Sequence, residues 1–128
     1  MAAKMLDTSS LIDIERGFPF ALAFLADAQR ADDELLTCDI IVAEYYSGRG
    51  YGEMPSMDRL LAGLRFVVID FAVALTAADY RREFARRGIQ LTTMDTLIAA
   101  AARSMGATLV THNMKDFPMT DLSVFELA

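Results

Sequence analysis

The chain has 128 residues, a length that suits one domain and leaves no room for a second of ordinary size. Hydrophobic residues make up 54% of it and charged residues 23%, which supplies a core and excludes a disordered or low-complexity chain. Twelve basic and 18 acidic side chains give a formal net charge of −6, a balance that disfavours nucleic-acid binding through bulk charge. We therefore expect one globular domain over residues 1–128, on which any basic surface is local.

Apolar runs and cysteine content bear on the cellular location. Every apolar run is shorter than the roughly 18 residues of a membrane span, and Asp70 interrupts the best candidate, residues 66–75. The first ten residues carry Asp7 and have no apolar core of a secretory signal. The single cysteine, Cys38, has no partner for an intramolecular disulfide. These features predict a cytoplasmic protein without a membrane segment.

Short apolar runs alternate with helical patterns in the first half of the chain. The pattern predicts a strand at residues 4–6, followed by a helix to Gly17 that the hydroxyls after Asp7 can cap. Pro19 opens a second helix, which gives way to a polar stretch at 29–34. A strand at 35–37 and a helix that Asp39 caps and Gly48 ends complete this half.

The second half continues the alternation after a predicted loop at residues 47–56, which holds three glycines and a proline. A helix at 57–64, a strand at 66–69 and a long helix from 73 to Gly88 follow. Another helix from 92 ends at Gly106, before strands at 108–111 and 124–127. The alternation predicts an α/β three-layer sandwich, with a central parallel sheet of about five strands flanked by helices.

Four acidic residues fall where the site of a parallel sheet is expected, beyond the carboxyl ends of the strands. Asp7 follows the first strand, and Glu44 lies about one turn into the helix after the second. Asp95 lies in the first turn of the helix predicted from residue 92, and Asp116 follows the fourth strand. Four carboxylates that meet at one sheet edge suit Mg²⁺ or Mn²⁺, which prefer oxygen ligands. Without metal the carboxylates repel one another, so at least one is expected to have a raised pKa.

Each acid also has a structural interpretation. Asp7 fits a helix cap, Glu44 a solvated helix residue, Asp95 a capping acid opposite Thr92, and Asp116 a turn residue. The conjunction of the four therefore carries the metal hypothesis, and no single acid does. Because His112 is the only histidine, a catalytic triad or a histidine-rich zinc site is hard to build from this sequence.

Three segments resemble the signature blocks of PIN-domain ribonucleases, in particular the VapC-type toxins of prokaryotic toxin–antitoxin pairs. They are MLDTSSLIDI at 5–14, IVAEYYSG at 41–48 and MDTLIAAAARSMGATLVTHNMKDF at 94–117. The blocks come in the family's order and spacing, and the resemblance covers nearly the whole chain. It implies a PIN-like fold and metal-dependent endonucleolytic cleavage of RNA, in which bound metal activates a water for in-line attack on a phosphodiester.

The resemblance extends to single positions, where the family's acidic quartet matches Asp7, Glu44, Asp95 and Asp116. These four would hold Mg²⁺ or Mn²⁺ directly or through water, and they would form the catalytic cluster. The supporting polar residues of the family match Thr8, Ser9, Thr111 and Asn113. The resemblance also implies RNA as the substrate, with tRNA or rRNA as the expected target, a cognate antitoxin as a partner, and a homodimer.

Residues outside these blocks supply further candidates. Arg49, in the glycine-rich loop, is the best-placed contact for an RNA phosphate. A base could stack on Tyr45 or Tyr46, although burial in the helix packing is expected for at least one of them. Two further sets of residues each have a structural alternative. The arginines at 81, 82, 86 and 87 could contact RNA phosphates, or they could form local ion pairs such as Glu83–Arg87. Met54, Met57 and Leu61 could line a groove for a partner, or they could belong to the core.

Two other functions compete with the nuclease. A two-component receiver domain has similar length, charge and architecture, but it needs paired acids after the first strand and a lysine after the fifth. Here Asp7 stands alone, and Lys115 is the only lysine beyond Lys4. The second competitor is a PIN fold that no longer cuts and serves as an interaction module, against which the intact acidic quartet argues.

Overall fold

A computed structural model describes residues 2–127 of the chain. Five strands form one sheet in the order β3-β2-β1-β4-β5, and every neighbouring pair is parallel. The strands are β1 (Ala3–Leu6), β2 (Glu34–Cys38), β3 (Arg65–Val67), β4 (Thr108–Thr111) and β5 (Val124–Glu126). The predicted fold class, a parallel sheet of five strands between helices, is confirmed.

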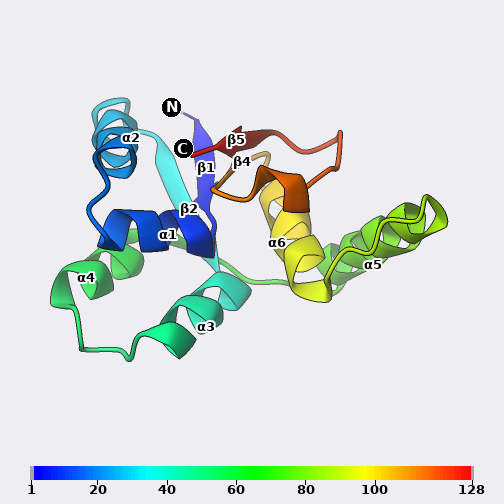
Figure 1. Ribbon diagram of the computed structural model, residues 1–128, viewed down its shortest axis with the longest axis horizontal. Coiled ribbons are helices and arrows are strands. Elements are labelled where there is room, and N and C mark those ends of the chain that lie inside the picture. The colour runs from blue at the N-terminus through cyan, green and yellow to red at the C-terminus, as the bar shows by residue number, and fades with distance from the viewer. Residues whose placement is uncertain (1, 128) are drawn as a thin grey trace.

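Helices cover both faces of the sheet. In the described residues they are α1 (Thr8–Glu15), α2 (Pro19–Arg30), α3 (Asp39–Gly48), α4 (Pro55–Gly63), α5 (Phe71–Arg86), α6 (Thr93–Ser104) and the short 3₁₀ helix η1 (Met114–Asp116). The chain runs from β1 to β3 in one direction and then returns to β4, so right-handed crossovers place α1–α4 on one face and α5–α6 on the other. Figure 1 shows α5 packed on α6 and extending away from the other helices.

The core lies around the two central strands, β1 and β4. Met5, Leu6, Leu109 and Val110 have no exposed surface, as expected for parallel strands that are covered on both faces. Helix α6 faces this core with four consecutive buried alanines at positions 99–102, whose small side chains allow the helix to lie close to the sheet. None of the described helices combines the length and the apolar composition that crossing a membrane requires.

Local signals set most element boundaries, and two of the predicted caps are wrong. Helix α1 is capped by Asp7, whose carboxylate accepts the N–H of Thr8. The structural interpretation of Asp7 is therefore confirmed, and a hydroxyl after it is not the cap. In α3 the cap position belongs to Cys38, whose backbone is extended, and Asp39 is the first helical residue, with its carboxylate accepting the N–H of Ile40.

The ends of the other elements follow the predictions with small shifts. Gly88 and Gly106 end α5 and α6 with φ of 78° and 61°, the left-handed backbone that glycine adopts without cost. Strand β3 ends at Val67, two residues earlier than predicted, because the chain leaves the sheet at exposed Val68. Asp70 then caps α5 by accepting the N–H of Val73, so this helix begins two residues before the predicted position.

Candidate metal centre

The strand order reverses between β1 and β4, which lie side by side at the middle of the sheet. Their carboxyl ends carry Asp7 and Thr111, and the N–H of Asp7 donates to the carbonyl of Val110 at 2.9 Å. Ligands of open parallel sheets bind beyond the strand ends at such a reversal. The backbone of two adjacent strands thus fixes the first predicted site residue at the expected place.

Asp7 is only 7% exposed, and both of its carboxylate oxygens accept hydrogen bonds. The N–H of Thr8 donates to Oδ1 at 2.8 Å, and the hydroxyl of Thr111 donates to Oδ2 at 2.8 Å. Burial raises the pKa of Asp7, these two hydrogen bonds lower it, and the nearby charges of Glu44 and Asp95 raise it further. The predicted raised pKa is therefore present, but desolvation contributes more to it than repulsion among the acids.

Hydroxyl groups tie α1 to the end of β4 around this carboxylate. The Oγ1 of Thr111 accepts the N–H of Asn113 at 3.0 Å and lies 3.3 Å from the Oγ of Ser9, which accepts the N–H of His112 at 2.9 Å. Thr8, Ser9 and Thr111, predicted as supporting residues, therefore all lie at the site. Asn113 joins this network through its backbone, while its side chain is exposed.

The other three acids form a rim, in which two lie near Asp7 and the third lies near Asp95. The hydroxyl of Thr8 donates to Oε1 of Glu44 at 3.1 Å, which couples this glutamate to the start of α1. Burial raises the pKa of Asp95, a hydrogen bond from Thr92 lowers it, and the charge of Asp116 raises it. Glu44 and Asp95 thus lie within electrostatic reach of Asp7, and Asp116 lies within reach of Asp95.

The donor chemistry fits a hard divalent cation, because all four side chains offer carboxylate oxygens. Within residues 2–127, no three acidic, histidine or cysteine side chains are spaced to hold a metal ion as a group. Mg²⁺ characteristically keeps several waters and takes only one or two carboxylates directly. The arrangement therefore suits an ion that Asp7 binds directly and the rim acids reach in part through water.

The remaining candidates have structural partners. Arg49 forms an ion pair with Glu15, described below. Tyr45 is buried, as expected for one of the two tyrosines, and Met57 and Leu61 belong to the core. Most of the arginines of α5 make local contacts: Arg81 with Leu91 and Thr93, Arg82 with Asp79, and Arg87 with Glu83 at 3.6 Å.

Comparisons with known proteins identify the family of the chain. The profile of the PIN domain matches residues 4–121. Ribonuclease VapC2 of Haemophilus influenzae is 31% identical over an alignment that covers 91% of each chain. Ribonuclease VapC10 of Mycobacterium tuberculosis is 32% identical, over 90% of this chain and 86% of the relative. The chain therefore belongs to the PIN-domain family and, within it, to the VapC ribonucleases.

Solved structures show the same fold. The structure of VapBC2 from Rickettsia felis bound to a promoter DNA fragment superposes with a TM-score of 0.82 at 21% identity. It covers 98% of this chain and 99% of the matched one. VapBC-1 from nontypeable Haemophilus influenzae superposes with a TM-score of 0.80 at 24% identity, over 98% of both chains. At these identities the match establishes the fold of the chain.

Proposed function

We propose that this protein is a Mg²⁺- or Mn²⁺-dependent endoribonuclease that hydrolyses RNA phosphodiesters as the toxin of a VapBC-like toxin–antitoxin pair. One observation carries the proposal: Asp7 is fixed by both carboxylate oxygens at the strand reversal, with Glu44 and Asp95 close enough to raise its pKa. The VapC ribonucleases among the relatives support the same chemistry.

The divalent ion, when bound, supplies a Lewis acid for the phosphoryl oxygen and lowers the pKa of a coordinated water. Asp7, Glu44, Asp95 and Asp116 would hold it. Thr111 and the N–H of Thr8 fix the orientation of the Asp7 carboxylate, and the hydroxyl of Thr8 orients Glu44.

A histidine base is not part of the proposed chemistry. The Nδ1 of His112 lies 3.0 Å from the Oδ2 of buried Asp13, which holds the imidazole against α1. In this proposal the carboxylates of the quartet handle protons and position the phosphodiester. This agrees with a mechanism in which the nucleophile is water and no side chain is acylated or phosphorylated.

The proposed partners are an RNA substrate, such as tRNA or rRNA, and an antitoxin protein. Matched structures of VapBC complexes from several bacteria support the antitoxin. We also infer a homodimer, because exposed apolar side chains gather along the segment from β3 into α5, namely Phe66, Val68, Phe71 and Leu75. A reducing cytoplasm suits the lone thiol of Cys38, whose pKa burial raises to about 11.

Cleavage of total cellular RNA by purified, antitoxin-free protein tests the proposal. The reaction is run with Mn²⁺, with Mg²⁺ and with EDTA, beside an Asp7→Asn variant purified identically. Discrete fragments that require metal and are missing with the variant are expected. Equal products from both proteins, or products that persist in EDTA, would contradict the proposal and favour an interaction module that does not cut.

A further inference from the structure

A hollow of about 210 Å³ opens between α1 and α3, directly beside the acidic quartet. Glu44, a member of the quartet, forms part of its wall, and Glu15, Arg16, Tyr45 and Arg49 form most of the rest. The hollow therefore adjoins the proposed metal centre through this shared residue. Its two arginines distinguish it from the purely acidic centre.

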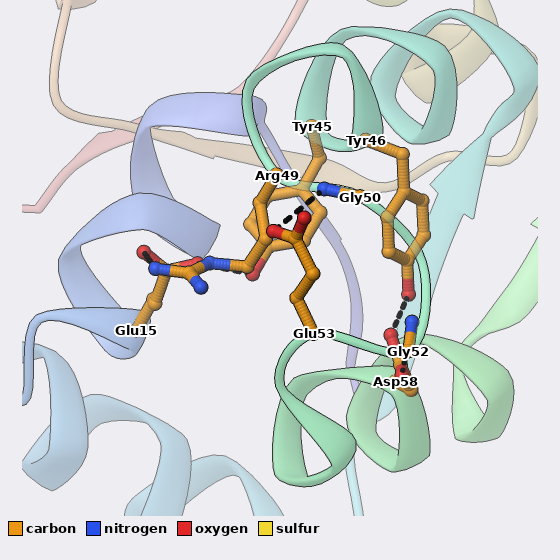
Figure 2. A network of polar contacts seen from close by, with 8 residues as sticks. All are labelled: Glu15, Tyr45, Tyr46, Arg49, Gly50, Gly52, Glu53 and Asp58. Atoms are coloured by element: carbon orange, nitrogen blue, oxygen red, sulfur yellow. Dashed lines mark hydrogen bonds and ion pairs between the residues drawn. The ribbon is translucent and has the colours of Figure 1, made fainter.

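The guanidinium of Arg49 is held in a defined orientation at this hollow. Its Nε donates to Oε1 of Glu15 at 2.6 Å and its Nη2 donates to Oε2 at 3.0 Å, a two-point ion pair. The hydroxyl of Tyr45 donates to the same Oε1 and fixes Glu15 in turn. Figure 2 shows the guanidinium of Arg49 extended toward Glu15, with the ring of Tyr45 behind it.

The loop that follows Arg49 is fixed as well, although it lacks regular structure. Oε2 of Glu53 accepts the N–H of Gly50 at 3.1 Å. Asp58 accepts the N–H of Gly52 at 3.0 Å and the hydroxyl of Tyr46 at 2.7 Å (Figure 2). The backbone on both sides of Arg49 is thus anchored, by α3 before it and by these carboxylates after it.

The pairing with Glu15 uses only one edge of the guanidinium. Nη1 has no hydrogen-bond partner among residues 2–127, so the Nη1–Nη2 edge remains available for a second planar or tetrahedral anion. Arg16 adds a second positive charge at the hollow, is exposed, and has no ion pair in the described part of the chain. The charge of Arg16 also acts on Glu15, and the charge of Glu53 also acts on Arg49. The two glutamates and two arginines that line the hollow cancel in charge, so a cation bound at Glu44 would make the hollow positive.

We infer that this hollow is a subsite for a backbone phosphate of the RNA, next to the scissile one, bound by Arg49 and Arg16. The inference rests on the proposed nuclease function and assigns to it a substrate contact. Glu15 and Tyr45 are positioning residues, which act by holding the guanidinium of Arg49. Because a phosphate carries no base identity, the subsite strengthens binding to every RNA sequence and does not select among them.

RNA binding measured over a salt series tests the subsite. Each protein carries Asp7→Asn to prevent cleavage, and the probe is a fluorescein-labelled oligouridylate read by fluorescence anisotropy. Arg49→Gln is expected to raise Kd about tenfold, as loss of one charge-assisted phosphate contact does. It should also make the slope of log K against log salt shallower by about 0.7, the value for one phosphate on a single strand. Arg16→Gln should change both quantities in the same direction.

Arg65→Gln is the matched control, because Arg65 also pairs with a glutamate, Glu34, at 3.0 Å, but at β3, away from the hollow. Arg65→Gln removes one positive charge, as Arg49→Gln does, and it is expected to leave Kd within about twofold of the value for the Asp7→Asn protein. Arg49→Lys keeps the positive charge but loses the planar guanidinium with its paired donors. It should therefore restore the slope of log K against log salt while leaving Kd raised. An equal loss in Arg49→Gln and Arg65→Gln would overturn the subsite, because it would show that only bulk charge matters.

The positioning role of Glu15 is tested by a double-mutant cycle. Glu15→Gln should raise Kd at least twofold while Arg49 is present, because the guanidinium is then no longer held, and it should have no effect on Kd in the Arg49→Gln background. Additive effects would overturn the positioning role. The melting temperature of each variant, measured in parallel, identifies any that fail to fold.

Cleavage kinetics with Mn²⁺ separate this inference from the proposed function. In otherwise wild-type protein, Arg49→Gln is expected to raise KM about tenfold and leave kcat within about twofold, since the contact lies beside the reacting bond. If wild-type protein cleaves RNA but Arg49→Gln matches it in KM and Kd, the subsite is wrong and the nuclease stands. If wild-type protein cleaves no RNA, the proposed function fails.

Discussion

Two polar regions lie side by side in this molecule and are built in opposite ways. Around Asp7, a buried carboxylate is held by the ends of two central strands and by hydroxyls of α1 and β4. Around Arg49, a partly exposed pair is held by a loop and by the carboxylates of Glu15, Glu53 and Asp58. The first region places a single group rigidly, at the cost of desolvating its charge.

The second region contributes little to the folding stability of the protein, because ion pairs near solvent are weak. Its fixed geometry depends on many small contacts, and its outer edge remains open to solvent. Under the two proposals, reaction chemistry depends on the part that the sheet makes rigid, and substrate contacts depend on the part that tolerates change. Mutations should therefore separate the two regions by their effects on activity and on stability.

The largest expected difference is in cleavage rate after the same carboxylate-to-amide change in each region. Asp7→Asn removes the central ligand charge and should lower cleavage by about 10³-fold or more, since metal activation supplies most of the rate. Glu15→Gln should lower it by about tenfold or less, because its effect passes through Arg49. Gel-based initial rates on one RNA substrate compare the two variants. Similar losses would remove the distinction between the regions.

Metal binding should stabilise the protein only through the first region. At a free Mn²⁺ concentration of about 100 times Kd, linkage predicts about 2.7 kcal/mol of added stability for wild-type protein. Asp7→Asn should show little of this gain, while Glu15→Gln should keep it. Chemical denaturation with and without metal measures the effect, and an equal gain in all three proteins would place the metal elsewhere.

Removal of the hydroxyl of Thr111 should destabilise the first region. Thr111→Val leaves one oxygen of buried Asp7 without its donor, which costs about 2 kcal/mol. Thr108→Val is the control on the same strand, because the hydroxyl of Thr108 contacts only Ser123, in an exposed position. Urea denaturation of both variants measures the difference. Equal stability of the two would contradict a role for Thr111 in holding the carboxylate.

The pH dependence of stability without metal should also report on Asp7. Its pKa is raised in the folded chain, so the unfolded chain releases this proton first and binds fewer protons at the same pH. Stability in EDTA should therefore fall as pH rises from the unfolded value of 3.8 through the folded pKa, and should stay lower above it. Other carboxyls, such as Glu15, have lowered pKa values and contribute in the opposite direction.

Asp7→Asn isolates this contribution, because asparagine caps a helix about as well as aspartate and cannot titrate. The difference in unfolding free energy between variant and wild type should grow as pH rises from about 4 to about 7. A difference that stays constant over this range would show that the pKa of Asp7 is the same in the folded and unfolded chains.

The smallest expected effect is on the folding stability of the second region. Arg49→Gln should shift the melting temperature by no more than about 2 °C, as for other ion pairs near solvent, and should match Arg65→Gln in this. Differential scanning fluorimetry of both variants checks it. A large drop for Arg49→Gln alone would mean that the loop network supports the fold as well as the substrate.

Much of this structure could be predicted from the sequence, since each strand is a short apolar run and each main helix begins or ends at a recognisable signal. The positions of Asp7 and Asp95 followed from local rules, because Asp7 follows β1 and Asp95 lies in the first turn of α6. The short helix η1 was missed, since three residues around Asp116 carry no periodicity. The acids of the quartet could be proposed from the sequence, and their role, their metal and their reaction stay predictions.

Contacts between distant segments could not be predicted in this way. Glu15 reads as an ordinary acid at the end of an amphipathic helix, and its partner Arg49 lies 34 residues further along. Nothing in the local sequence around either residue indicates the pair. The hydroxyl of Thr111 entered only through the resemblance, because its bond to Asp7 depends on the register of β1 against β4.

The bond between Asp7 and Thr111 joins residues 104 positions apart, and this has a consequence for how the protein is made. Asp7 is synthesised well before β4, so its carboxylate has no hydroxyl of Thr111 to hold it until β4 has been made. A nascent chain that stops short of β4 lacks both this bond and the pairing of β1 with β4. Under the proposed function, RNA cleavage therefore begins only after β4 has been made and has joined the sheet.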